Sequence, residues 1–600
     1  MRKHILIIVL LLTVCAIYSQ KFLNVEKKNN SIKSFNLLAS EISFSQSGNI
    51  IVKKGTNNPI QIAISDIDKI KLNDSLTIEE ADSLSNFIVG SCGACDLRIT
   101  NTGDLTVDKT NTIHNLTIER GGNVTLNDGV VFNANNIIIN SDVNGTGTLV
   151  DKSPIGSTLN GTVQQYLGSA RNWYLTSPVL GATVPNGQVY YSYDESGSNT
   201  GFAAPATNYW VANTEGTALN SMRGYIAQPL SSTTLNFVGI LNTGNKTLTL
   251  SRTSGKLKEG FNLVANPYPS YLDWRLVSAA NPGLLKTAWL RTKNTSEGYM
   301  FATVNVADAE NPIIVAVNPN TTITTLIPPM QAYWVRVINA SESIPIEGPD
   351  EVHTSYNIDN AMRKHIDETG NRFKVPKQNT QLLMRLQVSN GVNTDETVLF
   401  FNSKASNALD MYDSPKMSNN LTAVPEIYTR IGADDLVING MNQIQYDTKI
   451  PLGFSTLQAN SFTIKISELN NFDANAKIIL VDNELRTEQD LTNGMSYNFE
   501  SGITNTNERF SLIFKTSSAT MDVANIEKLN GQVFVNTQNH ITIIVTEKAI
   551  CNIFDFLGQK QYQKMIYSPK ETVNETFSSG VYFVELLTNG KREVTKVVIR

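Results

Sequence analysis

Histidine and cysteine are scarce in this chain, and their scarcity limits the chemistry that it can perform. The 600 residues include five histidines and four cysteines. The histidines stand singly, so the sequence has no His-x-x-x-His or His-Glu-x-x-His pair of the kind that binds zinc. It also lacks the Gly-x-Ser-x-Gly elbow of hydrolases and a phosphate-binding loop. These absences predict a protein that is not an enzyme and that has no catalytic, metal or cofactor site.

Charged residues are also few, and their signs nearly balance. Asp and Glu number 54 and Lys and Arg number 49, which gives a net charge of −5. A chain with this balance offers no basic surface for nucleic acid, so we exclude nucleic acid as a partner. Charged residues make up 17% of the chain and hydrophobic residues 41%, which is typical of compact β-rich domains. The length allows roughly three to five such domains.

Long apolar runs are missing except at the N-terminus. Residues 5–14 are apolar, follow Arg2 and Lys3, and precede the small residue Ser19. The run is too short to cross a bilayer, which takes about 20 residues. A basic start, an apolar core and a small residue are typical of a cleavable secretory signal. We therefore expect a signal peptide at residues 1–19, no transmembrane segment, and a mature protein that is soluble or attached to a surface.

Cys92 and Cys95 have the spacing of a redox or metal-binding motif. A redox pair of this kind precedes a helix, whose N-terminus lowers the thiolate pKa. The residues from Asp96 onward instead predict a strand and a turn, and no second cysteine pair is present to complete a zinc site. We favour a local disulfide or unreactive surface thiols, with redox chemistry and metal binding as the alternatives.

Short apolar pairs with two-residue spacing recur between residues 96 and 151. They follow one another at intervals of 8 to 13 residues, separated by turns rich in Asn, Thr, Gly and Asp: Leu105/Val107, Leu116/Ile118, Val124/Leu126 and Ile137/Ile139. Strands this short cannot bury their apolar faces singly, but stacked coils can, as in a parallel β-helix. Gly121 and Gly122 suit a tight corner that needs positive φ. We expect a short β-helix, with an antiparallel meander as the alternative.

All five tryptophans lie in the central region, at positions 173, 210, 274, 289 and 334. Exposed aromatic rings can stack on sugar faces, whereas buried rings are the largest contributors to a sandwich core. Core packing is the expectation for most of these rings. Trp173, Trp210 and Trp289 are the candidates for a glycan-binding platform.

Carboxylates give two further hypotheses. A glycosidase needs two carboxyl groups about 5–10 Å apart, contributed by different strands, whereas Asp194 and Glu195 are neighbours and are expected to be solvated surface. Asp395, Asp410 and Asp413 carry the oxygen ligands that Ca²⁺ takes, but they lack EF-hand spacing, so we favour turn capping. A lyase or glycoside hydrolase whose catalytic residues are scattered through the sequence is the alternative to a non-catalytic protein.

The C-terminal segment, residues 521–600, consists of short alternating strands bounded by turns. Tyr582, Val584 and Leu586 share one face, as a half-buried strand requires. A Leu-Gly-Gln turn, a Gly-Val-Tyr strand and a final Lys-Val-Val strand occur in this order. The succession resembles the type A C-terminal sorting domain of the type IX secretion system of Bacteroidota. The residues that carry this resemblance are Leu557, Gly558, Gln559, Gly580, Val581, Tyr582 and Lys596.

This resemblance implies export across the outer membrane by the type IX secretion machinery, removal of the domain, and attachment of the rest to the surface or its release. The segments 260–274 and 327–335 resemble parts of uncharacterised surface proteins that carry the same kind of domain. We therefore expect a secreted or cell-surface protein with a role in adhesion, glycan binding or structure. Its partners would be glycans or host and matrix surfaces.

The expected fold is all-β and multidomain. Residues 350–379 are polar with mixed charge, which predicts a linker, and alternating strands on both sides of it predict two sandwiches of jelly-roll or Ig-like type. The expected parts are a signal peptide (1–19), a β-hairpin module (20–90), a β-helix-like segment (91–159), an aromatic-rich β-sandwich (160–349), a linker (350–379), a second β-sandwich (380–515) and an Ig-like sorting sandwich (521–600).

Overall fold

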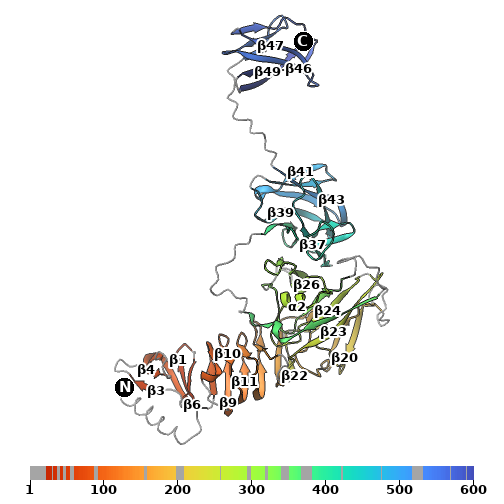
Figure 1. Cartoon of the computed structure of the whole chain (residues 1–600). Helices are drawn as coiled ribbons and strands as arrows, with labels where there is room; N and C mark the ends of the chain where they lie inside the picture. Colours follow the sequence, from red (N-terminus) through yellow and green to blue (C-terminus); the bar gives the residue numbers. More distant parts are fainter. Residues whose placement is uncertain are drawn as a thin grey trace. The chain divides into compact units, whose positions relative to one another are not determined.

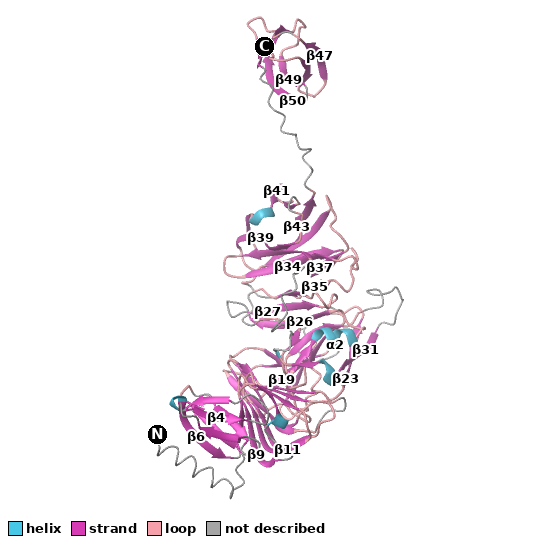
Figure 2. Ribbon diagram, turned by 60° about the vertical axis from the view of Figure 1, so that its left-hand side comes forward, coloured by secondary structure: helices cyan, strands magenta, loops and turns pink. Residues whose placement is uncertain are grey.

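The structure is a computed structural model, and its secondary structure is nearly all β (Figure 2). Within the described residues the one α-helix is α2 (Trp274–Ala280). This confirms the all-β class. The structure describes residues 22–29, 32–36, 41–44, 49–53, 60–73, 75–86, 92–153, 158–197, 209–256, 258–293, 299–317, 322–338, 351–366, 381–419, 423–473, 476–516, 532–567, 569–588 and 591–600. The expected signal peptide lies outside these residues.

Two small antiparallel sheets form the N-terminal module. Their strands are β1 (Phe22–Lys27), β2 (Ile32–Asn36) and β6 (Ile67–Asn73) in one sheet, and β3 (Glu41–Phe44), β4 (Asn49–Lys53) and β5 (Ile60–Ala63) in the other. Phe22 is buried in the core of the following solenoid, and Ser34 Oγ accepts a hydrogen bond of 3.0 Å from Thr77 N. The module therefore packs on the first solenoid coil, as a capping unit does in repeat proteins.

A parallel β-helix follows, and it confirms the predicted solenoid (Figure 1). One sheet contains β7 (Ser75–Ile78), β9 (Cys92–Ile99), β11 (Asn111–Ile118), β13 (Phe132–Ile139) and β17 (Asn160–Leu167). The other contains β8 (Ala81–Ser83), β10 (Asp104–Val107), β12 (Asn123–Leu126) and β16 (Thr148–Asp151). The parallel register stacks like residues, so that Leu116 lies between Leu97 and Ile137 with all three buried. The alternative of an antiparallel meander is wrong.

Both boundaries predicted for the β-helix fall inside it. At the start, Leu76 of β7 pairs in register with Leu97 of β9, so residues 75–86 form the first coil rather than part of the N-terminal module. At the end, β17 pairs antiparallel with β22 (Thr233–Ile240), which extends the same sheet past residue 160. Short strands acquire a partner only in three dimensions, and this is why the sequence placed the edges wrongly.

The central region contains two larger sheets that face each other across an aromatic core. The first comprises β18 (Trp173–Leu175), β21 (Tyr225–Ala227), β19 (Val189–Tyr193) and β20 (Trp210–Thr214), in spatial order. The second comprises β24 (Phe261–Ala265), β30 (Ala332–Arg336), β26 (Thr287–Lys293), β27 (Tyr299–Asn305) and β28 (Ile313–Val315). Tyr174 of the first sheet contacts Trp334 of the second, with ring centroids 6.3 Å apart. A sandwich core of aromatic rings results.

The predicted linker is wrong for residues 351–366, which belong to the folded core. β31 (Glu351–Ile358) pairs along its whole length with β23 (Lys246–Thr253). After η4 (Asn360–Met362), β32 (Arg363–Lys364) joins β25 (Tyr271–Asp273), which also pairs with β29 (Leu326–Ile327). The polar residues of β31 alternate with Val352, Tyr356 and Ile358, so one face of the strand is apolar. Residues 367–380 lie outside the described residues.

The second sandwich region is an eleven-stranded sheet that curls over its own core. Its strands are β33 (Leu382–Ser389), β34 (Thr394–Phe401), β35 (Ser414–Pro415), β36 (Glu426–Ile431), β37 (Asp434–Met441), β38 (Lys449–Thr456), β39 (Asn460–Asn470), β40 (Lys477–Asp482), β41 (Thr487–Asp490), β42 (Ser496–Ser501) and β43 (Thr504–Lys515). Phe454 of β38 lies 5.1 Å from Phe462 of β39 and 5.2 Å from Phe499 of β42, measured between ring centroids. These strands are distant in the sheet, so its two halves must face each other.

The C-terminal strands form a compact unit of their own. One sheet contains β44 (Gln532–Val535), β45 (Ile541–Ile544) and β48 (Lys570–Thr572), and the other contains β47 (Lys560–Ile566), β46 (Ala549–Asp555), β49 (Gly580–Thr588) and β50 (Lys591–Ile599). Tyr582, Val584 and Leu586 point into the shared core, as their spacing predicts. The unit is therefore a small β-sandwich.

Candidate binding and sorting sites

The three motifs of the C-terminal unit meet at one end of its larger sheet. Leu557, Gly558 and Gln559 form the turn after β46, where Asp555 Oδ1 accepts hydrogen bonds of 2.9 Å from the backbone N–H groups of Leu557 and Gln559. Gly558 has φ of 78°, a left-handed conformation that favours glycine. Asp555 pairs with Tyr582 of β49, which in turn pairs with Val597 of β50. The turn therefore adjoins the strand that begins at Gly580.

The outer face of this sheet carries exposed apolar side chains beside charged ones. Val581 pairs with Val598, and Phe583 pairs with Lys596, so these four side chains project from the same face. Phe583 and Val598 are 38% and 51% exposed. Only the inward face of β49 was predicted from the sequence, because a strand with apolar residues on both faces shows no alternation of apolar and polar residues. This outer face is a candidate contact surface.

The three candidate tryptophans do not form a common exposed platform. Trp289 is fully buried: its ring lies 5.1 Å from that of Phe261, and its Nε1 donates to the Pro415 carbonyl at 3.0 Å. Trp210 is half-buried against Trp334, 6.0 Å away. Trp173 is half-buried against the solenoid core. The platform is wrong for Trp289 because its strand is central in a sheet that faces a second sheet, where large rings fill the core.

Trp173 instead belongs to a cluster in which arginines lie against aromatic rings. The guanidinium carbon of Arg171 lies 3.8 Å from the Trp173 ring centroid. That of Arg291 lies 4.1 Å from the Tyr299 centroid, and Arg291 Nη1 donates to the Tyr174 hydroxyl at 3.1 Å. The two halves are joined where the backbone N–H of residue 172 donates to the Tyr299 hydroxyl at 2.8 Å. We call these five side chains, Arg171, Trp173, Tyr174, Arg291 and Tyr299, the arginine–aromatic cluster.

The positive charges of this cluster have no partner of opposite charge in the part of the chain that the structure describes. Among the described residues no carboxylate forms an ion pair with Arg171 or Arg291, and the buried Nε of each has no hydrogen-bond partner. Burial lowers the pKa of Arg171, and repulsion by Arg291 lowers it further, against the opposite influence of Tyr299. Guanidinium groups keep their positive charge in proteins. No local pattern in the sequence marks these two arginines, because they lie far apart along the chain and come together only in the fold.

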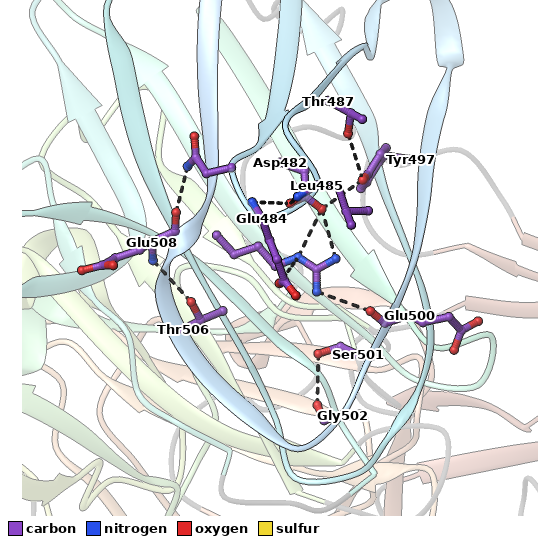
Figure 3. Close-up of polar contacts among 12 residues, drawn as sticks. Asp482, Glu484, Leu485, Thr487, Tyr497, Glu500, Ser501, Gly502, Thr506 and Glu508 are labelled. Carbon is purple, nitrogen blue, oxygen red and sulfur yellow. Dashed lines mark hydrogen bonds and ion pairs between the residues drawn. The ribbon is translucent and has the colours of Figure 1, made fainter.

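Another buried arginine, Arg509, is neutralised by a carboxylate, as is usual for a buried charge. Arg509 also lies against rings, 4.7 Å from Phe499, but its Nη2 donates to Asp482 Oδ2 at 3.0 Å. Tyr497 donates to the same oxygen at 2.9 Å, as Figure 3 shows for Asp482 and Tyr497. Burial alone would raise the pKa of Asp482, but hydrogen bonds from Leu485 N, Arg509 and Tyr497 bring it below its usual value. This charge pair is internally satisfied and serves the fold.

A polar trough of about 760 Å³ runs along one corner of the β-helix. Ion pairs between successive coils line it: Arg98 Nε lies 3.0 Å from Glu119 Oε1, and Arg120 Nε lies 2.7 Å from Asp142 Oδ2. Asn140 Nδ2 donates to the other oxygen of Glu119 at 2.9 Å. Because these charges pair with each other, the trough is a stabilised ladder rather than a site that needs a charged ligand.

The three cysteines of the described residues are buried, and two of them form a disulfide. Cys92 and Cys95 are joined as a disulfide, with their Cα atoms 5.4 Å apart, and both side chains lie in the solenoid core. The alternative of surface thiols is wrong, because β9 turns both sulfurs inward. Cys551 is buried in the sorting sandwich, and burial raises the pKa of its thiol to about 12. A thiol held protonated in this way is unreactive.

The carboxylates singled out in the sequence analysis bind backbone and cations. Glu195 is buried rather than solvated, and its Oε1 accepts from Thr253 N and Gly260 N at 2.9 and 2.7 Å. Asp395 pairs with Lys416. Asp413 Oδ1 accepts from Gly440 N at 2.9 Å, and burial raises its pKa to about 8.

A search of the described residues finds no group of three His, Cys, Asp or Glu side chains placed to hold a metal ion. In the same residues, no helix has both the length and the apolar character that a membrane crossing requires.

The fold is an all-β architecture in which a β-helix, two further β regions and a C-terminal β-sandwich follow one another along the chain. The chain belongs to the family described as "Domain of unknown function (DUF8693)", which matches residues 71–514. Residues 535–600 match the secretion system C-terminal sorting domain. The protein therefore carries a type IX sorting domain, is handled by that secretion machinery, and is secreted or attached to the outer-membrane surface.

One curated relative is the minor fimbrium subunit Mfa5 of Porphyromonas gingivalis, which is 22% identical over 569 residues. The alignment covers 87% of this chain and 44% of the relative, so the chain spans less than half the length of that protein. A solved structure of a biofilm associated protein, BSP domain, matches with 9% identity and a TM-score of 0.11, covering 73% of this chain and 91% of that one. A TM-score this low carries no argument.

Proposed function

We propose that the protein is a non-catalytic adhesion protein that acts at the cell surface or after release from it. The observation that carries this proposal is the presence, in one chain, of a C-terminal sorting domain and a large all-β region that belongs to a single family. Export places that region outside the cell. A region outside the cell can bind an external surface through contacts alone, without catalytic residues.

The curated relative supports an adhesive role. Its name describes it as a subunit of a minor fimbrium, and its similarity extends over 87% of this chain. Because this chain matches only 44% of that protein, the role that we infer is attachment, and assembly into a fimbrium is not part of the proposal.

The contacts of the carboxylates support the proposal that the protein is not a catalyst. Glu195 holds two backbone N–H groups, Asp435 pairs with Arg430 at 2.8 Å, and Asp308 Oδ1 accepts from Glu310 N at 3.1 Å. Each of these acids stabilises a turn or a strand end. A glycoside hydrolase needs a pair of carboxyl groups that face a substrate.

Attachment of living cells tests this proposal. Bacteria that produce the chain should adhere to mucin- or matrix-coated surfaces more than bacteria that lack it, and complementation should restore adhesion. Purified protein should release no reducing ends from the polysaccharides that it binds. Equal adhesion with and without the protein would contradict the adhesive role. Release of reducing ends would show that the protein is an enzyme.

A further inference from the structure

The arginine–aromatic cluster contains two cations that no carboxylate of the described residues neutralises. A half-buried guanidinium without a carboxylate costs free energy, because it has lost water without gaining an ion pair. Two like charges near each other add repulsion. Stacking on Trp173 and Tyr299 recovers part of this cost. The remainder would be recovered by an anion bound between the guanidinium groups.

The cluster is built to hold its arginines in place. Trp173 Nε1 donates to the Ser169 carbonyl at 2.9 Å, which fixes the ring beneath Arg171. The Tyr174 hydroxyl accepts from Arg291 Nη1, and Tyr299 carries the Arg291 guanidinium on its face. Guanidinium groups fixed in this way bind a carboxylate or sulfate with little loss of side-chain entropy.

The neighbouring groups suit a sugar. Gln228 Nε2 donates to Asn172 Oδ1 at 2.9 Å, so two amides lie beside Arg171 and present donors and acceptors suited to hydroxyl groups. Gln228 is exposed, and Arg171, Arg291, Tyr299 and Phe301 are half-buried, so the cluster is open to solvent. Cations, amides and ring edges together match a saccharide that carries an acidic group.

We propose that the arginine–aromatic cluster binds an anionic saccharide, whose carboxylate or sulfate lies between Arg171 and Arg291. This inference rests on the proposed adhesive function and names the chemical class of its target. Uronic acids and sulfated sugars share this chemistry, and the experiment distinguishes between them.

The test is calorimetric titration of the full chain with three probes at about 0.15 M salt, where exposed charges are screened within about 8 Å. Hyaluronan oligosaccharides carry carboxylates alone, dextran sulfate carries sulfates alone, and dextran is neutral. The wild type should bind hyaluronan, dextran sulfate or both, and should not bind dextran. Which of the two anionic probes binds identifies the acidic group.

Substitutions then assign the binding to the cluster. Arg171→Gln and Arg291→Gln should each weaken binding by about tenfold or more, since each removes charge-assisted hydrogen bonds to the anion. Arg430→Gln is the matched control: it removes the same charge from an arginine paired with Asp435 in another sheet, and it should bind as the wild type does. Unchanged thermal unfolding of each variant confirms that it is folded.

Three results would overturn the proposal: no binding of either anionic probe, equal weakening by Arg430→Gln, or binding of poly-glutamate in place of both saccharides, which would indicate an acidic protein. The cell assay separates this failure from that of the adhesive function. If cells that carry Arg171→Gln and Arg291→Gln together adhere normally, the adhesive function stands and the site is wrong.

Discussion

Arg363 and His365 lie in a segment whose composition predicted a linker, yet both are buried and both hold the solenoid against the neighbouring strands. Arg363 Nη2 donates to the Leu149 carbonyl at 2.6 Å, and Nε donates to Ser270 Oγ at 3.0 Å. His365 lies between two hydroxyls of the solenoid, with Nε2 3.0 Å from Thr125 and Nδ1 2.6 Å from Thr148. Burial, reinforced by the nearby Arg363, lowers the pKa of His365 to about 3.

The His365 contact predicts a loss of stability in mild acid. Because the folded pKa lies below the ordinary 6.5, the unfolded chain binds a proton that the folded chain rejects as the pH falls from 6.5 towards 3. Between pH 7 and pH 5 this one group should lower the free energy of unfolding by about 2 kcal/mol. Urea unfolding at the two pH values measures the loss.

His365→Gln should remove this part of the pH dependence, because glutamine keeps polar contacts but does not titrate. If the free energy of unfolding falls equally in His365→Gln and in the wild type between pH 7 and pH 5, the inference that His365 is neutral in the folded protein is wrong.

At the scale of the element, the β-helix depends on how closely successive coils approach. Gly161 of β17 pairs with Ile137 of β13, and a Cβ at Gly161 would lie 2.5 Å from the Ile137 carbonyl oxygen and 2.9 Å from the Ile137 Cβ. Backbone atoms of a neighbouring coil cannot move aside as a flexible side chain can. Gly93, in β9 of the same sheet, has no atom within 4 Å of the corresponding position.

Gly161→Ala should therefore destabilise the solenoid by about 1–3 kcal/mol, the usual cost of overpacking. Gly93→Ala adds the same methyl group at an open position and should change the free energy of unfolding by less than about 0.5 kcal/mol or raise it slightly. Chemical denaturation of both variants measures the difference. Equal stability of the two would show that the coils are not closely packed at β17.

At the scale of the whole molecule, the sorting domain and the large β region form separate compact units. The sorting sandwich has its own core, in which Val584 of β49 is fully buried. The large β unit has separate cores, one of them the solenoid core. Contacts are dense within each unit, so damage to the sorting core should leave the folding of the other unit intact.

Val584→Asp should abolish surface delivery, because an unpaired carboxylate in the sorting core costs several kcal/mol and unfolds this small sandwich. Tyr567→Ser, at a residue of the same unit that is 73% exposed, is the control and should be exported normally. Cell fractionation with surface proteolysis measures delivery. Export of Val584→Asp at the wild-type level would show that the folded sorting sandwich is not what the machinery requires.

Short-range patterns in the sequence predict several features of the fold. The two-residue apolar spacing of pairs such as Leu116/Ile118 predicts coils, since strands that short must stack to bury a face. The inward face of β49 and the sorting motifs around Leu557 and Gly580 also follow from residues near each other in sequence. These features are determined by the sequence alone because their physical cause, alternation along one strand or chemistry at one turn, acts over a few residues.

Only the tertiary structure decided which distant residues meet. Trp289 is buried because a second sheet covers its strand, and β31 is part of the core because β23 pairs with it. Arg171 and Arg291 are 120 positions apart in sequence, and the structure brings both near Tyr299, where no carboxylate of the described part of the chain pairs with them. The burial of a side chain and the pairing of its charge depend on all its neighbours in space. Many of these neighbours are distant in sequence, so no local sequence pattern predicts either property.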